Sequence, residues 1–160
     1  MSGFGSDDPR EMPMHLFRGS LRVDYGSAVR SDPGKQNCSI CPRYWYVDAF
    51  FLCDRCGSEF VFSAAEQRLW YEQYGFWVDS IPRHCVSCRR ELRDLKAARR
   101  EYDANVERVL ERGDLESRKQ LARVIDQLYE LGSPLPPQIT ENRRRLAKQI
   151  ASAERKGDGQ

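Results

Sequence analysis

The chain has 160 residues, of which 40% are hydrophobic and 31% are charged, and its formal net charge is +2. This length suits one domain, or one small domain with an extension. The sequence has no apolar run of about 18 residues, which excludes a membrane-spanning helix, and its start lacks the pattern of a signal peptide. These features predict a cytoplasmic protein with no membrane partner, in which six cysteines indicate metal or redox chemistry rather than a disulfide framework.

Positive charge is concentrated in the C-terminal half of the chain. Residues 83–160 carry 18 basic and 13 acidic side chains, whereas residues 1–82 carry 8 and 11. The excess of +5 favours an acidic partner. The arginine clusters are interleaved with acids, however, as is typical of a solvated helix face, and a nucleic-acid surface usually shows a stronger basic stripe.

The N-terminal part of the chain predicts little regular structure. Residues 1–14 are rich in Gly, Ser, Asp and Pro, which is typical of disorder, and residues 15–25 (HLFRGSLRVDY) alternate weakly, as one strand would. SAVRSDPGKQN is a loop by composition. We therefore expect residues 1–37 to be mostly disordered, with one strand.

Aromatic residues and cysteines crowd the next segment. RYWYVDAFFLC and EFVF predict two strands. Ser63 and Glu66 then form a capping box that begins a short helix, and Gly75 lies where that helix should end. FWVDS predicts another strand. The rings are expected to fill the core of a small domain; the alternative is a stacking platform for single-stranded nucleic acid. Residues 38–91 thus predict a small β domain with one capped helix.

Helical periodicity begins after Cys88. Apolar residues recur at three- and four-residue steps as far as Gly113, and Asp114 can cap a second helix. Residues 92–131 therefore predict an antiparallel helical hairpin. Residues 132–160 predict a proline linker followed by a basic amphipathic helix or tail. The expected fold class is α+β, a small β domain with one short capped helix followed by a C-terminal α-helical hairpin extension.

All six cysteines lie in CxxC pairs. Two residues between thiolates allow one tight turn to aim both sulfurs at one ion, and tetrahedral zinc needs two such turns. The pair at 53 and 56 has the most favourable turn for ligation, because Gly57 follows it and can adopt a positive φ. The pair at 85 and 88 leads into a helix, and the N-terminus of a helix stabilises thiolates. Pro42 weakens the turn of the first pair by removing an N–H. The predicted zinc ligands are Cys53, Cys56, Cys85 and Cys88.

Cys38 and Cys41 leave several alternatives open. They can pair with the ligands at 53 and 56 in a rival grouping, or bind a second zinc completed by His84, by His15 or by another subunit. They can also form a redox-active dithiol, or pack as reduced thiols near the sheet. We interpret His15 as a packed residue.

The residues beside the predicted ligands are expected to support them. Zinc bound by four thiolates carries a formal charge of −2, which nearby arginines can offset. His84 directly precedes a ligand, and its ring should point away from the ion. The predicted supporting residues are Arg55, Gly57, Arg83, His84 and Arg89.

Residues 48–91 resemble the zinc-ribbon domain family of uncharacterised bacterial proteins. The resemblance rests on the two CxxC pairs with Gly57 and Arg89, the aromatic strand, the helix opening at Glu66-Gln67, Gly75-Phe76 and Pro82. The resemblance implies one zinc ion bound by both CxxC pairs. It gives no information about an activity. The helical tail lies outside it.

No catalytic set is present in the sequence: there is no glycine-rich phosphate loop, GxSxG or HExxH motif, and four thiolates close a zinc site to substrate. We therefore expect a non-enzymatic zinc-binding module without a small-molecule substrate. It would engage a protein partner, or self-associate, through its C-terminal helices. The alternatives are a nucleic-acid-binding protein and a thiol redox switch at Cys38 and Cys41.

Overall fold

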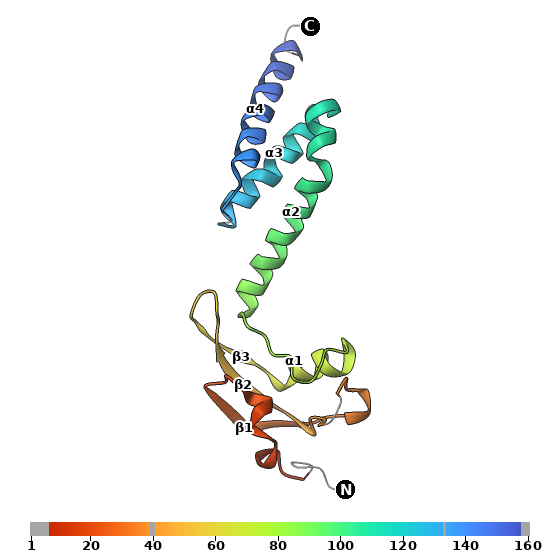
Figure 1. The fold of residues 1–160 in the computed structure, drawn as a ribbon, viewed down its shortest axis with the longest axis vertical. Helices are drawn as coiled ribbons and strands as arrows, with labels where there is room; N and C mark the ends of the chain where they lie inside the picture. The colour runs from red at the N-terminus through yellow and green to blue at the C-terminus, as the bar shows by residue number, and fades with distance from the viewer. Residues whose placement is uncertain (1–6, 39–40, 133, 158–160) are drawn as a thin grey trace. The chain divides into compact units, whose positions relative to one another are not determined.

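The computed structural model describes residues 7–38, 41–132 and 134–157. The chain divides into two compact units, Met1–Cys88 and Arg89–Gln160 (Figure 1). The α+β class predicted from the sequence is confirmed, since the first unit holds a small sheet and the second is helical. The finer division into four parts stays a prediction.

The first unit is built on a three-stranded antiparallel sheet of order β1-β2-β3 (Figure 1). Its strands are β1 (Arg22–Arg30), β2 (Trp45–Leu52) and β3 (Glu59–Phe62). The pairing of β1 with β2 shifts register between Asp24 and Val29. The cause is local, because the Asp24 side chain accepts a hydrogen bond of 2.8 Å from the Gly26 N–H and so diverts the backbone from the ladder.

The N-terminal strand lies later in the chain than its alternation predicted. Met14–Phe17 forms a 3-10 turn instead, and Leu16 and Phe17 are buried in the core. A positive φ of 83° at Gly19 then turns the chain toward β1. Pro9–Glu11 forms another 3-10 turn, while residues 1–6 of the segment expected to be disordered lie outside the described residues.

The capping box begins a helix as predicted. The Ser63 side chain accepts a hydrogen bond of 3.1 Å from the Glu66 N–H at the start of α1 (Ala64–Arg68), which continues into a π-helical turn, Leu69–Gln73. The strand predicted for FWVDS is wrong. The Ser80 N–H donates to the Trp77 carbonyl at 2.8 Å and closes a turn, which leaves one isolated bridge from Trp77 to Asn37.

Arg43 is buried in the core of the first unit, with 1% of its surface exposed. Its Nε donates to the Val78 carbonyl at 2.7 Å, and its Nη2 donates to the Leu16 carbonyl at 2.8 Å. The guanidinium lies 5.0 Å from the centre of the Tyr71 ring. Burial lowers the pKa of Arg43, and the side chain ties the N-terminal turn to the segment after the helix.

The second unit packs three successive antiparallel helices around one core: α2 (Val86–Arg112), α3 (Leu115–Glu130) and α4 (Pro137–Gly157) (Figure 1). Asp114 caps α3, because its side chain accepts a hydrogen bond of 2.8 Å from the Ser117 N–H. The predicted hairpin is therefore confirmed, and α4 adds to it through buried Ile139 and Leu146. Among the helices of the described residues, none has the length and apolar character needed to cross a membrane.

Gly113 allows the tight connection between α2 and α3. A Cβ at this position would lie 2.6 Å from the carbonyl oxygen and 2.9 Å from the Cα of Val109, closer than the two groups can approach. We expect Gly113→Ala to lower the free energy of unfolding of the second unit by about 2 kcal/mol, because the helix end must shift. Urea unfolding followed by circular dichroism at 222 nm measures this change. Glu111→Ala, which alters an exposed side chain, should change it by less than about 0.5 kcal/mol, and equal effects would contradict the steric explanation.

Candidate metal centre

The first cysteine pair lies in the turn between β2 and β3. Cys53 directly follows β2, and its N–H donates to the Ser58 carbonyl at 2.9 Å, which closes the turn. Gly57 adopts a φ of 71° and donates its N–H to the Cys53 carbonyl at 2.8 Å. Only a residue that tolerates positive φ fits here, so Gly57 allows the turn to bring both sulfurs to the same side.

The second cysteine pair lies at the start of α2. Cys85 directly precedes this helix, and Cys88 lies in its first turn. The segment before it is fastened to the first turn, because the Asp54 N–H donates to the Arg83 carbonyl at 2.9 Å. The Arg83 Nε also donates to Asp54 Oδ2 at 2.8 Å, although this ion pair is exposed and contributes little by itself.

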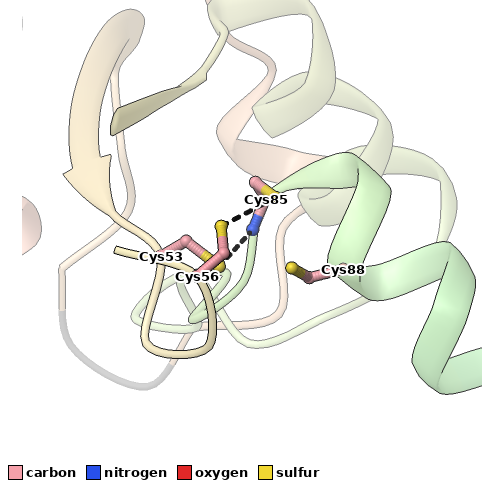
Figure 2. Close-up of side chains that lie close together, drawn as sticks. All are labelled: Cys53, Cys56, Cys85 and Cys88. Carbon is pink, nitrogen blue, oxygen red and sulfur yellow. Dashed lines mark hydrogen bonds between the residues drawn. The ribbon is translucent and has the colours of Figure 1, made fainter. Parts of the chain in front are cut away.

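These two turns bring four sulfur atoms together (Figure 2). The Sγ atoms of Cys53, Cys56, Cys85 and Cys88 all lie within 4.8 Å of one another. The Sγ atoms of Cys56 and Cys85 are 3.9 Å apart. Four sulfurs at the usual Zn–S distance of about 2.3 Å form a tetrahedron with edges of about 3.8 Å. The donor set therefore fits a tetrahedral zinc ion in both chemistry and spacing.

Backbone hydrogen bonds and burial act in opposite directions on the pKa values of the clustered cysteines. Burial disfavours the Cys53 thiolate, but hydrogen bonds from the backbone N–H groups of Cys56, Cys85 and Arg55 outweigh it and lower the pKa of Cys53 to about 6. The bond from the Cys85 N–H is 3.3 Å long (Figure 2). Burial, followed by contacts with the other three cysteines, raises the pKa of Cys88 to about 12. A cation bound between the four sulfurs would stabilise all of them as thiolates.

The four sulfurs differ in their access to solvent. Cys53 is 2% exposed and Cys88 is 5% exposed, so these two are enclosed by protein. Cys85 is half-buried, and Cys56 is exposed. A zinc ion held here would have all four positions filled by sulfur, which leaves no open position for a substrate.

The predicted supporting residues differ in how they relate to the four sulfurs. Gly57 shapes the first turn, Arg55 supplies a backbone N–H to Cys53, and Arg83 joins the two ligand segments. His84 is half-buried beside Cys85 in the sequence, and Arg89 is half-buried directly after Cys88. The roles assigned to these five residues as supporting groups stay predictions.

Two further contacts were not identified from the sequence. Hydrogen bonds from the side chain and backbone of Ser58 lower the pKa of Cys56. Asp54 pairs with Arg83 across the two ligand segments. A signal for the second contact does exist in the sequence, because an acid lies inside one CxxC pair and a base lies just before the other.

Cys38 and Cys41 lie outside the group of four. Cys38 is half-buried against the core of the first unit, and Cys41 is exposed. Residues 39–40 lie outside the described part of the chain. In that described part, the four clustered cysteines are the only set of three or more Cys, His, Asp or Glu side chains close enough to share an ion. The second-zinc, redox and packed-thiol alternatives for Cys38 and Cys41 stay predictions.

Comparison with known proteins supports the metal centre. Residues 47–96 match the family model of a probable treble clef domain. This segment contains all four clustered cysteines. No curated protein and no solved structure matches the chain.

The match covers the segment in which the sequence resembled a zinc-ribbon family. It supports a zinc-binding domain there, described as a treble clef rather than a ribbon. The predicted Zn²⁺ cofactor is confirmed by the arrangement of the four cysteines together with this match.

Proposed function

We propose that this protein is a non-catalytic interaction module that engages a protein partner. One structural zinc ion stabilises the fold of its first unit. The observation that carries the proposal is the convergence of four cysteine sulfurs from two turns that are 28 residues apart in the sequence. The surrounding unit, Met1–Cys88, is small, and a structural zinc ion contributes folding energy directly to a domain with a limited core.

The chemistry of the site favours a structural role over catalysis. Four sulfur ligands complete the coordination of zinc, whereas catalytic zinc keeps one position for water or substrate. Two of the ligands are enclosed by protein, which limits the approach of any reactant. None of the six cysteines forms a disulfide bond, which fits the reducing cytoplasm that we propose as the site of function.

Metal analysis of the purified full-length chain tests the structural role. We expect about one zinc per chain, and we expect a strong chelator to unfold the first unit because the ion is part of its core. Near-ultraviolet circular dichroism and tryptophan emission measure this unfolding, since all three tryptophans (Trp45, Trp70 and Trp77) lie in the first unit. Restoring zinc should restore both signals. A chain that keeps both signals after complete loss of zinc would refute the proposal.

Binding to nucleic acid is the competing function, and salt dependence separates the two. A nucleic-acid-binding protein should bind labelled single-stranded or duplex DNA or RNA at low salt, and its affinity should fall steeply as salt increases. The proposed module should bind none of these probes. Tight, salt-sensitive binding would replace the proposed function with a nucleic-acid-binding one.

A further inference from the structure

The second unit has an apolar groove on its surface, with a volume of about 370 Å³. Its apolar lining consists of Leu92, Leu95, Leu128 and Leu135, and we call it the leucine groove. We propose that the leucine groove binds an acidic amphipathic helix of a partner protein. This inference rests on the proposed interaction function and specifies its surface and the chemistry of its partner.

The apolar lining suits aliphatic side chains from a helix. Leu92, Leu95 and Leu135 are each half-buried, so they keep surface that a partner can cover, whereas Leu128 is 1% exposed and forms the deepest part of the lining. Covering this surface is favourable by roughly 25 cal/mol for each Å² removed from water. An amphipathic helix presents apolar side chains three and four residues apart, which is how such helices occupy grooves between helices.

The polar lining of the groove is entirely basic. It consists of Lys96, Arg99 and Arg100. Arg99 is occupied by Asp103, whose two carboxylate oxygens both lie 3.1 Å from its Nε. Lys96 and Arg100 are exposed, and among the described residues neither forms an ion pair. They are therefore available to carboxylates of a partner.

The charge of the whole second unit points to the same place. Residues 89–100 carry six basic and two acidic side chains, whereas residues 101–160 carry eleven of each. The entire positive excess of this unit is therefore contained in the segment of α2 that lines the leucine groove. Positive charge concentrated beside an apolar surface raises the association rate of an acidic partner and disfavours the binding of a basic one.

Two other occupants fit the groove less well. Nucleic acid would find two unpaired cations beside four leucines and no aromatic ring on which a base could stack. A second copy of the chain would need an exposed apolar face to insert. Among the described residues of the three long helices, the exposed large hydrophobic residues are Val86 on α2 and Tyr129 on α3, so none of these helices presents an apolar face. The other exposed large hydrophobic residues lie in the strands, short helical turns and loops of the first unit, which do not supply a long amphipathic helix. An acidic partner helix therefore satisfies both linings of the groove.

Designed peptides of opposite charge test the proposal on the zinc-loaded full-length protein. The first probe is a fluorescein-labelled amphipathic peptide of about 18 residues, or five helical turns, with leucines on one face and glutamates on the other. The matched probe carries lysines in place of the glutamates. Fluorescence anisotropy measures both affinities, and we expect the acidic peptide to bind at least about tenfold more tightly.

Charge reversal locates the binding site. Lys96→Glu combined with Arg100→Glu should weaken binding of the acidic peptide by at least about tenfold, because attraction is replaced by repulsion. Arg145→Glu combined with Lys148→Glu is the matched control, since it makes the same change in net charge at exposed positions of α4 outside the groove. The control pair should change the affinity by less than about threefold. Leu92→Ala should weaken it by about fivefold through the lost apolar contact.

Several results would overturn the proposal. These are equal binding of the two peptides, absence of binding by the acidic peptide, or equal effects of the two charge reversals. Sedimentation that shows a dimer abolished by the Lys96 and Arg100 reversal would assign the groove to a second copy, and binding of a labelled oligonucleotide abolished by it would assign the groove to nucleic acid. If the protein is folded and loaded with zinc but fails the peptide tests, only the proposal about the leucine groove is refuted. If the protein fails the zinc test, the proposed function itself is refuted.

Discussion

Replacing Cys53 by serine should abolish zinc binding and unfold the first unit. The expected loss is large, because structural zinc contributes about 10–16 kcal/mol in zinc-finger peptides, as much as the whole stability of many domains. Cys53 is 2% exposed and receives backbone hydrogen bonds from both ligand turns, so no other group can replace its sulfur. Elemental analysis should show a fall from about one zinc per chain to almost none.

The optical signals of the two units can be measured separately. The three tryptophans all lie in the first unit, whereas the long helices α3 and α4 lie in the second. We expect Cys53→Ser to shift tryptophan emission toward that of an unfolded chain and to leave most of the helical signal at 222 nm. The helices of the second unit should survive because they have their own apolar core.

Cys38→Ser provides the matched control for the ligand variant. Cys38 is half-buried but lies outside the group of four sulfurs, so its replacement should leave the zinc content and the tryptophan emission unchanged. Retention of zinc in Cys53→Ser, together with loss of zinc in Cys38→Ser, would contradict the ligand set. A full second equivalent of zinc that disappears in Cys38→Ser would instead support a second site.

Replacing Arg43 by methionine should lower the free energy of unfolding of the first unit by about 4 kcal/mol. Methionine keeps much of the apolar stem but leaves the carbonyls of Val78 and Leu16 without their donors. Each buried acceptor that loses its partner costs about 1–3 kcal/mol. Urea unfolding of the zinc-loaded protein, followed by tryptophan emission, measures the change.

Arg18→Met is the control for the buried arginine. Arg18 is exposed, so the same substitution should change the free energy of unfolding by less than about 0.5 kcal/mol. Removal of a buried charge can itself be favourable. An unchanged midpoint for Arg43→Met would therefore mean that this gain cancels the two lost hydrogen bonds, and our explanation of Arg43 would be wrong.

Features that depend on neighbours in the chain were predicted well from the sequence. The Ser63 and Asp114 caps each join residues three apart, and the turn of the first ligand pair joins Cys53 and Gly57, four apart, by a backbone hydrogen bond. The α+β class followed from the change from aromatic strands to helical periodicity. In these cases the chemistry of a few consecutive residues decides the local backbone conformation.

Features that depend on distant partners could not be predicted in this way. An arginine in the sequence normally indicates surface, yet Arg43 is buried because two carbonyls, 27 and 35 residues away, receive its hydrogen bonds. The FWVDS segment has strand composition, but in the described part of the chain its only β pairing is the bridge from Trp77 to Asn37. The position of β1 likewise depends on its partner β2, not on its own weak alternation.

The unequal exposure of the four sulfurs bears on how long an ion stays in place. A competing chelator or an electrophile meets Cys56 first, since Cys53 and Cys88 are shielded. Exchange of the ion with a chelator is therefore expected to begin at Cys56, and the conformation of the Gly57–Ser58 corner that shapes its turn should influence how fast this exchange occurs.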